Sequence, residues 1–499
     1  MSTYSQALGS QWANPGDILS ILLLIGGDIV QAAITQLVGY RLRLPGTRVH
    51  IPMAPVAFSF GWATYSFSNL VAAVGSMRLI PESDHPSILI NCSNGFVRQN
   101  HSWVLGRVLR DHEIHNIVDP RPLSEGGRAE SIRIDIFHLN PMTTPHCDLI
   151  WWLGWATLLV QLVIVIVPGI LYHDWTILLI ASAGITLVAV TCSLPQWIEE
   201  KWGTPSLSNR DKVTCLTRGN GHLHVMVFIS SPGSLDLERL ATRTPVCRTG
   251  TRWISLILSI SWVCLLISIS GLKEHTWFLI AIGGLGMLQN VLAAGISRSP
   301  AASNIHLTRF PQAPTIIGRR ERYKDDPNPD IDLEEDIQGL SAVKSWVSSH
   351  GGEPGLDEQA RMPSWMTSMA EEDGVPKWLA ALKATSTEKT GGDAEPNSSP
   401  FSLGTWIPFT SQNSKQDQVI YATGVQGALV ELEKWVPKAG LSLLPIFFPG
   451  GGLQYHDDDI RGNRFKKFWK RAYHTRTIRT TAEEKRRAEE RGKGKLLEV

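Results

Sequence analysis

The chain has 499 residues, a formal net charge of +1 and a mean hydropathy of -0.02. This near-neutral balance identifies no class of partner for the whole chain. Its six cysteines are far apart and form no CxxC pair, which excludes a zinc knuckle and a thioredoxin-like redox site. Several windows of about 20 residues are almost free of charge. They exclude an ordinary soluble protein, because a bilayer core ~30 Å thick requires about 20 apolar residues per helical span.

Six apolar segments are predicted to cross a bilayer: Ile18–Val38, Val56–Val74, Leu149–Leu171, Trp175–Leu194, Trp253–Leu272 and Trp277–Ile296. The second is the weakest, because it is rich in Ser, Thr and Asn. Very short links, Tyr172–Asp174 and Lys273–Thr276, join the last four spans into two antiparallel hairpins. Tryptophan prefers the headgroup layer, and five tryptophans lie at span ends: Trp151, Trp152, Trp175, Trp253 and Trp277.

Orientation follows from the distribution of Lys and Arg. The 75–148 segment holds seven Arg and the 195–252 segment holds eight basic residues, whereas the two hairpin links hold one, Lys273. The positive-inside rule therefore places both segments and the C-terminal region in the cytosol. Three arginines just after the first span conflict with this. Either six helices tolerate them outside, which we prefer, or the second segment is re-entrant and five spans leave the N-terminus outside.

The segments outside the spans have mixed patterns. In 75–148 we predict a helix at Ser102–His115 and a strand at Ser131–Phe137, and in 195–252 a hairpin around Asn220-Gly221. Sequons at Asn91 and Asn100 are expected to be unused in the cytosol. Linkers are predicted at 297–330 and 385–417, and the tail carries short amphipathic or apolar pieces: Leu333–Val347, Pro376–Ala384, Ala428–Val436 and Leu441–Phe448.

Asp28 lies in the middle of the first predicted span, where an acid costs roughly 2.5–3.5 kcal/mol. On a helical wheel it belongs to a polar stripe within about 80°, made of Ser20, Asp28, Gln31 and Thr35. One interpretation is an intramembrane site on a transport path. The other, which we favour, is that Asp28 is protonated or is hydrogen-bonded to another span, with Gln161, Gln289 or Asn290 as partner.

A basic aromatic segment lies near the C-terminus: Phe465, Lys466, Lys467, Phe468, Trp469, Lys470 and Arg471. As a helix it gathers its aromatic residues in one sector, and residues 461–495 have a net charge of +10. We predict that it contacts anionic headgroups of the cytosolic leaflet. A calmodulin-type or other partner helix and a solvated basic helix are alternatives, and nucleic acid is not expected as a partner.

No motif in the sequence predicts an enzyme, a cofactor or a metal site. Walker A, GxGxxG, GxSxG and HExxH motifs are absent. His112 and His115 are spaced i,i+3 with no third ligand, so a surface helix explains them. His222 and His224 face the same way on the predicted hairpin, but two histidines fall short of the three or four ligands of a zinc site.

Several stretches resemble a family of uncharacterised multi-pass integral membrane proteins of filamentous fungi: Asn14–Ser20, Gly26–Gln31, Ser102–Arg107, Leu216–Gly221, Gly427–Trp435 and Phe465–Arg471. The resemblance implies a multi-pass membrane location. It supplies no activity and no catalytic residue.

The sequence thus predicts an all-α membrane protein of about six transmembrane helices in three antiparallel hairpins, with small α+β cytosolic loops and a partly disordered C-terminal tail. The divisions are hairpins at 1–74, 149–194 and 253–296, cytosolic loops at 75–148 and 195–252, and a cytosolic tail at 297–499. The expected function is a scaffold or adaptor in the plasma membrane or an endomembrane, with cytosolic protein partners. The alternative is a solute or ion transporter that uses Asp28.

Overall fold

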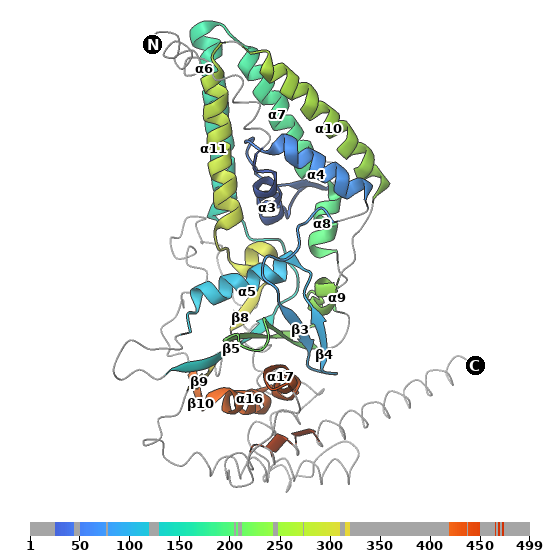
Figure 1. Cartoon of the computed structure of the whole chain (residues 1–499), viewed down its shortest axis with the longest axis vertical. Coiled ribbons are helices and arrows are strands. Elements are labelled where there is room, and N and C mark those ends of the chain that lie inside the picture. Colours follow the sequence, from blue (N-terminus) through green and yellow to red (C-terminus); the bar gives the residue numbers. More distant parts are fainter. Residues whose placement is uncertain are drawn as a thin grey trace, which may run out of the picture.

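A computed structural model describes residues 25–43, 50–75, 78–118, 129–203, 206–207, 212–242, 248–272, 274–309, 315–319, 419–436, 438–449, 465, 468–469 and 472–473. These residues form successive layers along the long axis of the molecule (Figure 1). Long apolar helices lie at one end, a layer of shorter helices follows, and a β-sheet with two further helices lies at the other end. The predicted linker at 385–417 and the pieces Leu333–Val347 and Pro376–Ala384 are outside the described residues.

Four helices of the described chain are long and apolar enough to cross a membrane, so the prediction of six spans is wrong. They are α6 (Leu149–Tyr172), α7 (Thr176–Cys192) continued by α8 (Pro195–Trp202), α10 (Thr249–Ser270) and α11 (Thr276–Gly295). They correspond to the last four predicted spans. Trp152, Trp175 and Trp253 are more than half exposed at the ends of these helices, as expected of side chains in a headgroup layer.

In the described part of the first two predicted spans, residues 25–38 and 56–74, the helices are short: α3 (Gly27–Leu37) and α4 (Trp62–Val74). At ~1.5 Å per residue they extend about 16 and 20 Å, well short of a ~30 Å bilayer core. Each begins after a glycine with positive φ, Gly26 or Gly61, a conformation that interrupts a helix. Between them come the paired strands β1 (Tyr40–Arg43) and β2 (His50–Met53) and an irregular, non-helical segment over residues 54–60.

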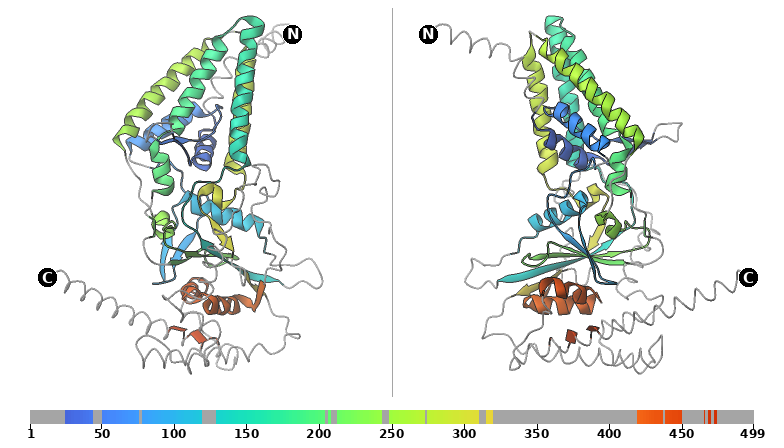
Figure 2. Two further views of the ribbon diagram at one scale, coloured as in Figure 1. Left: turned by 180° about the vertical axis from the view of Figure 1, so that it is seen from behind. Right: turned by 45° about the vertical axis from the view of Figure 1, so that its right-hand side comes forward.

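The short helices are enclosed by the long ones. α6 packs beside α11 and α10 beside α7, and the two pairs diverge toward the sheet. α3 contacts α11, α4 contacts α10, and both lie between the diverging pairs in each view (Figure 2). An apolar segment that packs against protein on several sides has the same composition as one that crosses lipid, which is why the two were confused.

The irregular segment 54–60 receives hydrogen bonds from side-chain amides of the long helices. Gln161 of α6 donates to the carbonyls of Phe58 (2.7 Å) and Ile282 (2.9 Å). Gln289 of α11 accepts from the Ala57 N–H (3.2 Å), and Asn290 donates to the Ser59 hydroxyl (2.7 Å). Non-helical backbone at membrane depth is tolerated only where protein satisfies its polar groups. The three amides proposed as partners of Asp28 thus hold this segment instead.

The remaining described strands form one mixed sheet of eight strands, which contradicts the all-α prediction. The order is β10-β9-β5-β7-β6-β3-β4, with β8 also paired to β5. The strands are β3 (Ile88–Asn91), β4 (Phe96–Gln99), β5 (Glu130–Leu139), β6 (Lys212–Thr217), β7 (His224–Ser230), β8 (Leu307–Arg309), β9 (Thr315–Arg319) and β10 (Val419–Thr423). The pairs β5–β7 and β9–β10 are parallel and the others are antiparallel. Segments before, between and after the membrane helices therefore share one sheet.

Alternation along the strands gives the sheet two apolar faces. On β5, Phe137 and Leu139 belong to a core that continues through the helix α5 (Trp103–His115) into the membrane helices. Ile132, Ile134 and Ile136 face the other way, into a second core covered by α16 (Gly424–Trp435) and α17 (Ala439–Phe447). Because the first core has no break between the sheet and the spans, these parts form one packed unit.

Several local predictions in the loops are confirmed. The helix at Ser102–His115 is α5, and the Ser102 hydroxyl caps it by accepting from the Leu105 N–H. The predicted strand is β5 and the predicted hairpin is β6–β7, followed by the short helix α9 (Leu237–Thr242). The linker predicted at 297–330 instead contributes a 3₁₀ turn at Pro300–Ser303 and two strands, because its apolar residues pair with β5.

The two sequons lie in ordered, buried structure. Asn91 donates to Glu238 (2.8 Å) and Asn100 donates to Ser87 (3.0 Å), and both asparagines are less than a tenth exposed. A glycan needs an exposed asparagine side chain, so neither position suits modification in the folded protein.

We predict that Gly286→Ala destabilises the protein whereas Gly284→Ala, two residues earlier in α11, does not. A Cβ at Gly286 would lie 1.9 Å from the Phe58 carbonyl oxygen, but one at Gly284 meets its nearest atom at 4.0 Å. Both changes gain about 1 kcal/mol of helix propensity, so the difference in stability reports the contact of α11 with the irregular segment 54–60. Thermal unfolding in detergent measures it, and equal midpoints for the two variants would contradict the packing described above.

Candidate functional site

The membrane helices and the sheet meet where α8 contacts the C-terminal end of α3. Lys201 of α8 is 1% exposed, and its Nζ donates to the carbonyls of Thr35 (2.6 Å), Gln36 (3.2 Å) and Val38 (2.8 Å). The last carbonyls of a helix have no partner within it and carry partial negative charge. The ammonium group therefore satisfies and stabilises the end of α3.

Arg298, just after α11, brings a second buried positive charge to the same place. Its guanidinium makes a two-point ion pair with Asp148 (2.6 and 2.7 Å) and donates to the Gln36 carbonyl, while its backbone N–H donates to Asp111 (3.0 Å). Asp148 in turn caps the first turn of α6. A paired geometry of this kind fixes position as well as contributing energy, so Arg298 joins α3, α5, α6 and α11.

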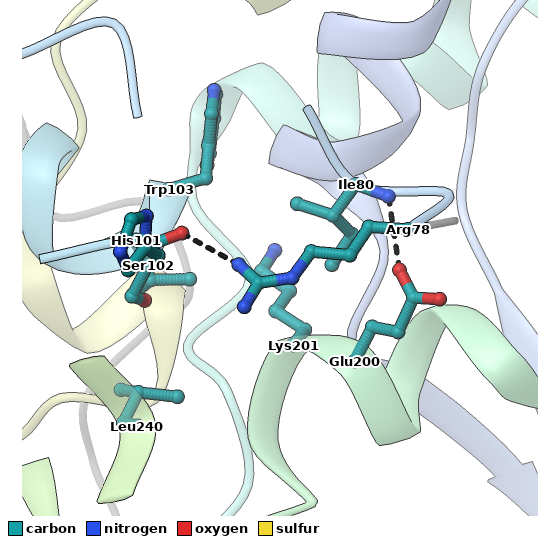
Figure 3. Close-up of a pocket in the computed structure, with 9 residues that line it drawn as sticks. Arg78, Ile80, His101, Ser102, Trp103, Glu200, Lys201 and Leu240 are labelled. Carbon is teal, nitrogen blue, oxygen red and sulfur yellow. Dashed lines mark hydrogen bonds between the residues drawn. The ribbon is translucent and has the colours of Figure 1, made fainter. Parts of the chain in front are cut away.

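Next to Lys201, Glu200 holds the chain that follows α4. Its carboxylate accepts from the N–H groups of Leu79 (2.8 Å) and Ile80 (3.0 Å), and Arg78 donates to the His101 carbonyl (2.9 Å). These groups surround a cavity of about 20 Å³ (Figure 3). This volume admits one water molecule. The joint, our name for the contact between the membrane helices and the sheet around Glu200, Lys201 and Arg298, therefore has no room for an organic ligand in this cavity.

A buried polar network lies between α5 and the sheet. Asp135 of β5 is fully buried and accepts from Arg133 (2.8 Å) and Thr315 (2.5 Å), and its Oδ2 lies 2.9 Å from His112 Nε2. Burial alone would raise the pKa of this carboxyl. The hydrogen bond and charge of His112, together with Arg133, outweigh burial and hold the pKa of Asp135 well below its usual value.

His224 of β7 extends this network. Its ring lies 6.0 Å from that of His112, at right angles. Burial, followed by the charge of His112, lowers the pKa of His224 from 6.5 to about 4. The prediction that His112 belongs to a surface helix is wrong, because the side chain is fully buried against the sheet. No group of three or more metal-ligating side chains is found in the described part of the chain.

The polar stripe predicted around Asp28 is described only in part. Ser20 lies outside the described residues. Gln31 donates to the Leu79 carbonyl (2.7 Å), and the Thr35 hydroxyl donates to the Gln31 carbonyl (2.8 Å), so both serve local packing. Asp28 is exposed in the first turn of α3, where a carboxylate complements the helix dipole.

The basic aromatic segment is only partly described. Phe468 and Trp469 are 0% and 2% exposed and pack in the second core, with Phe465 half-buried against it. These aromatic side chains therefore serve the core beneath the sheet, and in this structure they are not free to enter a lipid surface. Lys466, Lys467, Lys470 and Arg471 are outside the described residues.

Sequence reasoning missed the residues of the joint. Asp148 and Arg298 directly flank apolar segments, and Lys201 follows the fourth predicted span within a Trp-rich stretch. Charges at span ends are usually assigned to the headgroup layer, so their position alone did not distinguish lipid contact from a protein joint.

Comparison of the chain with protein-family models, with curated proteins and with solved structures finds no match in any of the three. The site and its chemistry therefore rest on the geometry above.

We predict that Lys201→Met lowers the free energy of unfolding by about 2–3 kcal/mol, because the carbonyls at the end of α3 lose a charged donor. Glu199→Gln on the same helix is the control. Glu199 pairs with Arg248 at the surface, where an ion pair contributes about 1 kcal/mol or less. Chemical unfolding in detergent compares the two, and a Lys201 variant as stable as the Glu199 variant would contradict the role of Lys201.

The lowered pKa of His224 predicts a pH-dependent stability. As pH falls from 6.5 to about 4, the unfolded chain takes up a proton at His224 while the folded chain does not, so stability decreases across this window. His224→Gln removes this contribution. The thermal midpoint of the variant should therefore depend less steeply on pH between 6.5 and 4 than that of the native chain; an unchanged slope would contradict the assignment.

Proposed function

We propose that this protein is a membrane scaffold or adaptor, whose membrane helices carry an α+β platform on one face of the bilayer. The platform is the eight-stranded sheet together with α5, α9, α16 and α17. The observation that carries the proposal is the sheet itself. Its strands come from segments before, between and after the membrane hairpins. The face of the sheet that carries Phe137 and Leu139 shares a core with the membrane helices. A rigid platform joined to the spans in this way suits the display of a binding surface at a fixed height above lipid.

We further propose that the platform faces the cytosol. Two hairpins with their links at the far end place every strand of the sheet on the same side, and the bias of Lys and Arg toward 75–148 and 195–252 supports the cytosolic side. The plasma membrane and an endomembrane are both compatible with this orientation.

The proposed partners are cytosolic proteins and anionic lipid headgroups. Headgroup binding now rests on the basic residues of the C-terminal segment rather than on its aromatic residues. The segment has four basic residues between Lys466 and Arg471, and each Lys or Arg near an anionic leaflet contributes about 1 kcal/mol. Because Phe468 and Trp469 pack in the second core, on the side of the sheet away from the membrane helices, the proposed headgroups are those of an apposed membrane.

A transporter that uses Asp28 is the second candidate, and one observation favours it. The N-terminal ends of α3 and α4 meet inside the helical part, since a Cβ at Gly61 would lie 2.6 Å from the backbone of Gly26. Interrupted helices with converging ends are found at the substrate sites of transporters. Against this, Gln161, Gln289 and Asn290 bond to backbone of the interrupted segment, which is a packing role.

One experiment separates the two candidates. The native chain, Asp28→Asn and the control Asp174→Asn, at an exposed hairpin link, are isolated in mild detergent, and co-isolated proteins and lipids are identified by mass spectrometry. The same preparations are placed in liposomes to measure proton and potassium flux. A scaffold gives one partner set for all three chains and no flux above empty liposomes. Flux that Asp28→Asn abolishes and Asp174→Asn retains would establish the transporter instead.

The lipid partner is tested in the same samples. Replacing Lys466, Lys467, Lys470 and Arg471 by Gln should reduce co-isolated anionic phospholipid. The control replaces four basic residues of the following charged stretch, Lys485, Arg486, Arg487 and Arg491. If both variants lost the same amount of lipid, the loss would depend only on total charge, which would contradict a specific headgroup-binding segment. Removal of the whole tail is unsuitable, because β8, β9 and β10 belong to it.

A further inference from the structure

Two cysteines meet in the second core, beneath the sheet. Cys92 directly follows β3 and Cys215 lies on β6, the neighbouring strand. Their Sγ atoms are 3.3 Å apart, and the side chains are 1% and 0% exposed. Neither is part of a disulfide bond in the structure.

The surroundings permit the sulfurs to approach further. A disulfide needs an S–S distance of about 2.05 Å, so the sulfurs must close by roughly 1.3 Å. Cys92 is the first residue of the turn between β3 and β4, which ends at Gly95 with positive φ. The Cys92 N–H donates to the Val213 carbonyl of β6 (3.0 Å), so its backbone stays beside the strand while its side chain can rotate and the rest of the turn can shift to supply the movement.

Access to the pair is controlled by α17. This helix packs on β3 and β6, and the Ser442 hydroxyl donates to the Cys92 carbonyl (3.3 Å). Peripheral helices open locally without global unfolding. Opening of α17 would expose the sulfurs to a small oxidant while the strands that hold them stay paired.

We propose that Cys92 and Cys215 are a site of reversible disulfide formation by peroxides. One thiolate attacks a peroxide oxygen, the O–O bond breaks, and a sulfenic acid and one water form. The second sulfur then attacks the sulfenic sulfur, the S–S bond forms, and a second water leaves. Hydrogen peroxide receives the two electrons, both thiol protons end in water, and a dithiol reductant reverses the reaction.

The bond would join strands that belong to different loops. β3 precedes the first membrane hairpin and β6 follows it, so the disulfide closes a ring that contains α6, α7 and α8. Cross-links that close long loops restrict the unfolded chain most strongly in the loop-entropy description. Oxidation should therefore make the platform more resistant to unfolding.

The test treats the full chain in detergent with hydrogen peroxide, alkylates remaining thiols, and maps peptides without reduction. We expect a peptide pair cross-linked through Cys92 and Cys215, a raised thermal midpoint, and loss of both after dithiothreitol. Cys215→Ala should show neither change. Cys264→Ala is the matched control, because that thiol is exposed in a membrane helix, and it should keep both.

A second variant, in which α17 packs less tightly, tests whether a lack of cross-linking arises only because the oxidant cannot reach the sulfurs. Leu443 is fully buried on α17, so Leu443→Ala should open this helix more often and speed cross-linking several-fold. If Cys92 and Cys215 stay reduced in both chains while Cys264 is oxidised, the proposal is overturned. Oxidation of either sulfur to a sulfinic acid without a cross-link would overturn it as well.

Discussion

Backbone polar groups that lie among membrane helices have no water to bond with, and this constraint shapes the helical end of the molecule. Residues 54–60 run through it as a non-helical segment. Gln161, Gln289 and Asn290 supply the hydrogen bonds that a helix would otherwise provide. Gly286 leaves room for the Phe58 carbonyl to approach. The positions of α3 and α4 on either side depend on this one segment being satisfied.

The same constraint is met by charges at the boundary with the sheet. The last turn of α3 ends in buried surroundings, and Lys201 and Arg298 supply its donors from two different elements. A buried charge is costly unless it is paired or hydrogen-bonded, and here several carbonyls and Asp148 fulfil that condition. Through these bonds to the end of α3, Lys201 and Arg298 fix the membrane helices relative to the platform.

Much of the local structure was predictable, because its causes are local. The four long spans follow from apolar length, α5 from the helical pattern of Ser102–His115, and the β6–β7 hairpin from Asn220-Gly221. The sheet was not predicted, because its pairings join segments that helical hairpins separate. The first two spans were mistaken because hydropathy does not distinguish protein from lipid as the surroundings of an apolar segment.

The candidate site was predictable only in part, for a related reason. His112 and His224 were both recognised in the sequence, but nothing in their spacing indicates that α5 lies across β7 or that Asp135 lies beneath it. Likewise the aromatic residues around Phe468 fit an amphipathic surface helix by periodicity. Their burial depends on an apolar sheet face contributed by distant strands.

The order of strands also has a consequence for synthesis. β5 pairs with β7 and β3 with β6, although α6, α7 and α8 lie between the members of each pair. The strands made first, β3 and β5, therefore keep unpaired edges during synthesis. Their partners follow only after a helical hairpin has entered the bilayer and returned the chain to the same side. Unpaired edges of this kind are prone to aggregation. The open edges of β3 and β5 therefore have to stay soluble until β6 and β7 have been made.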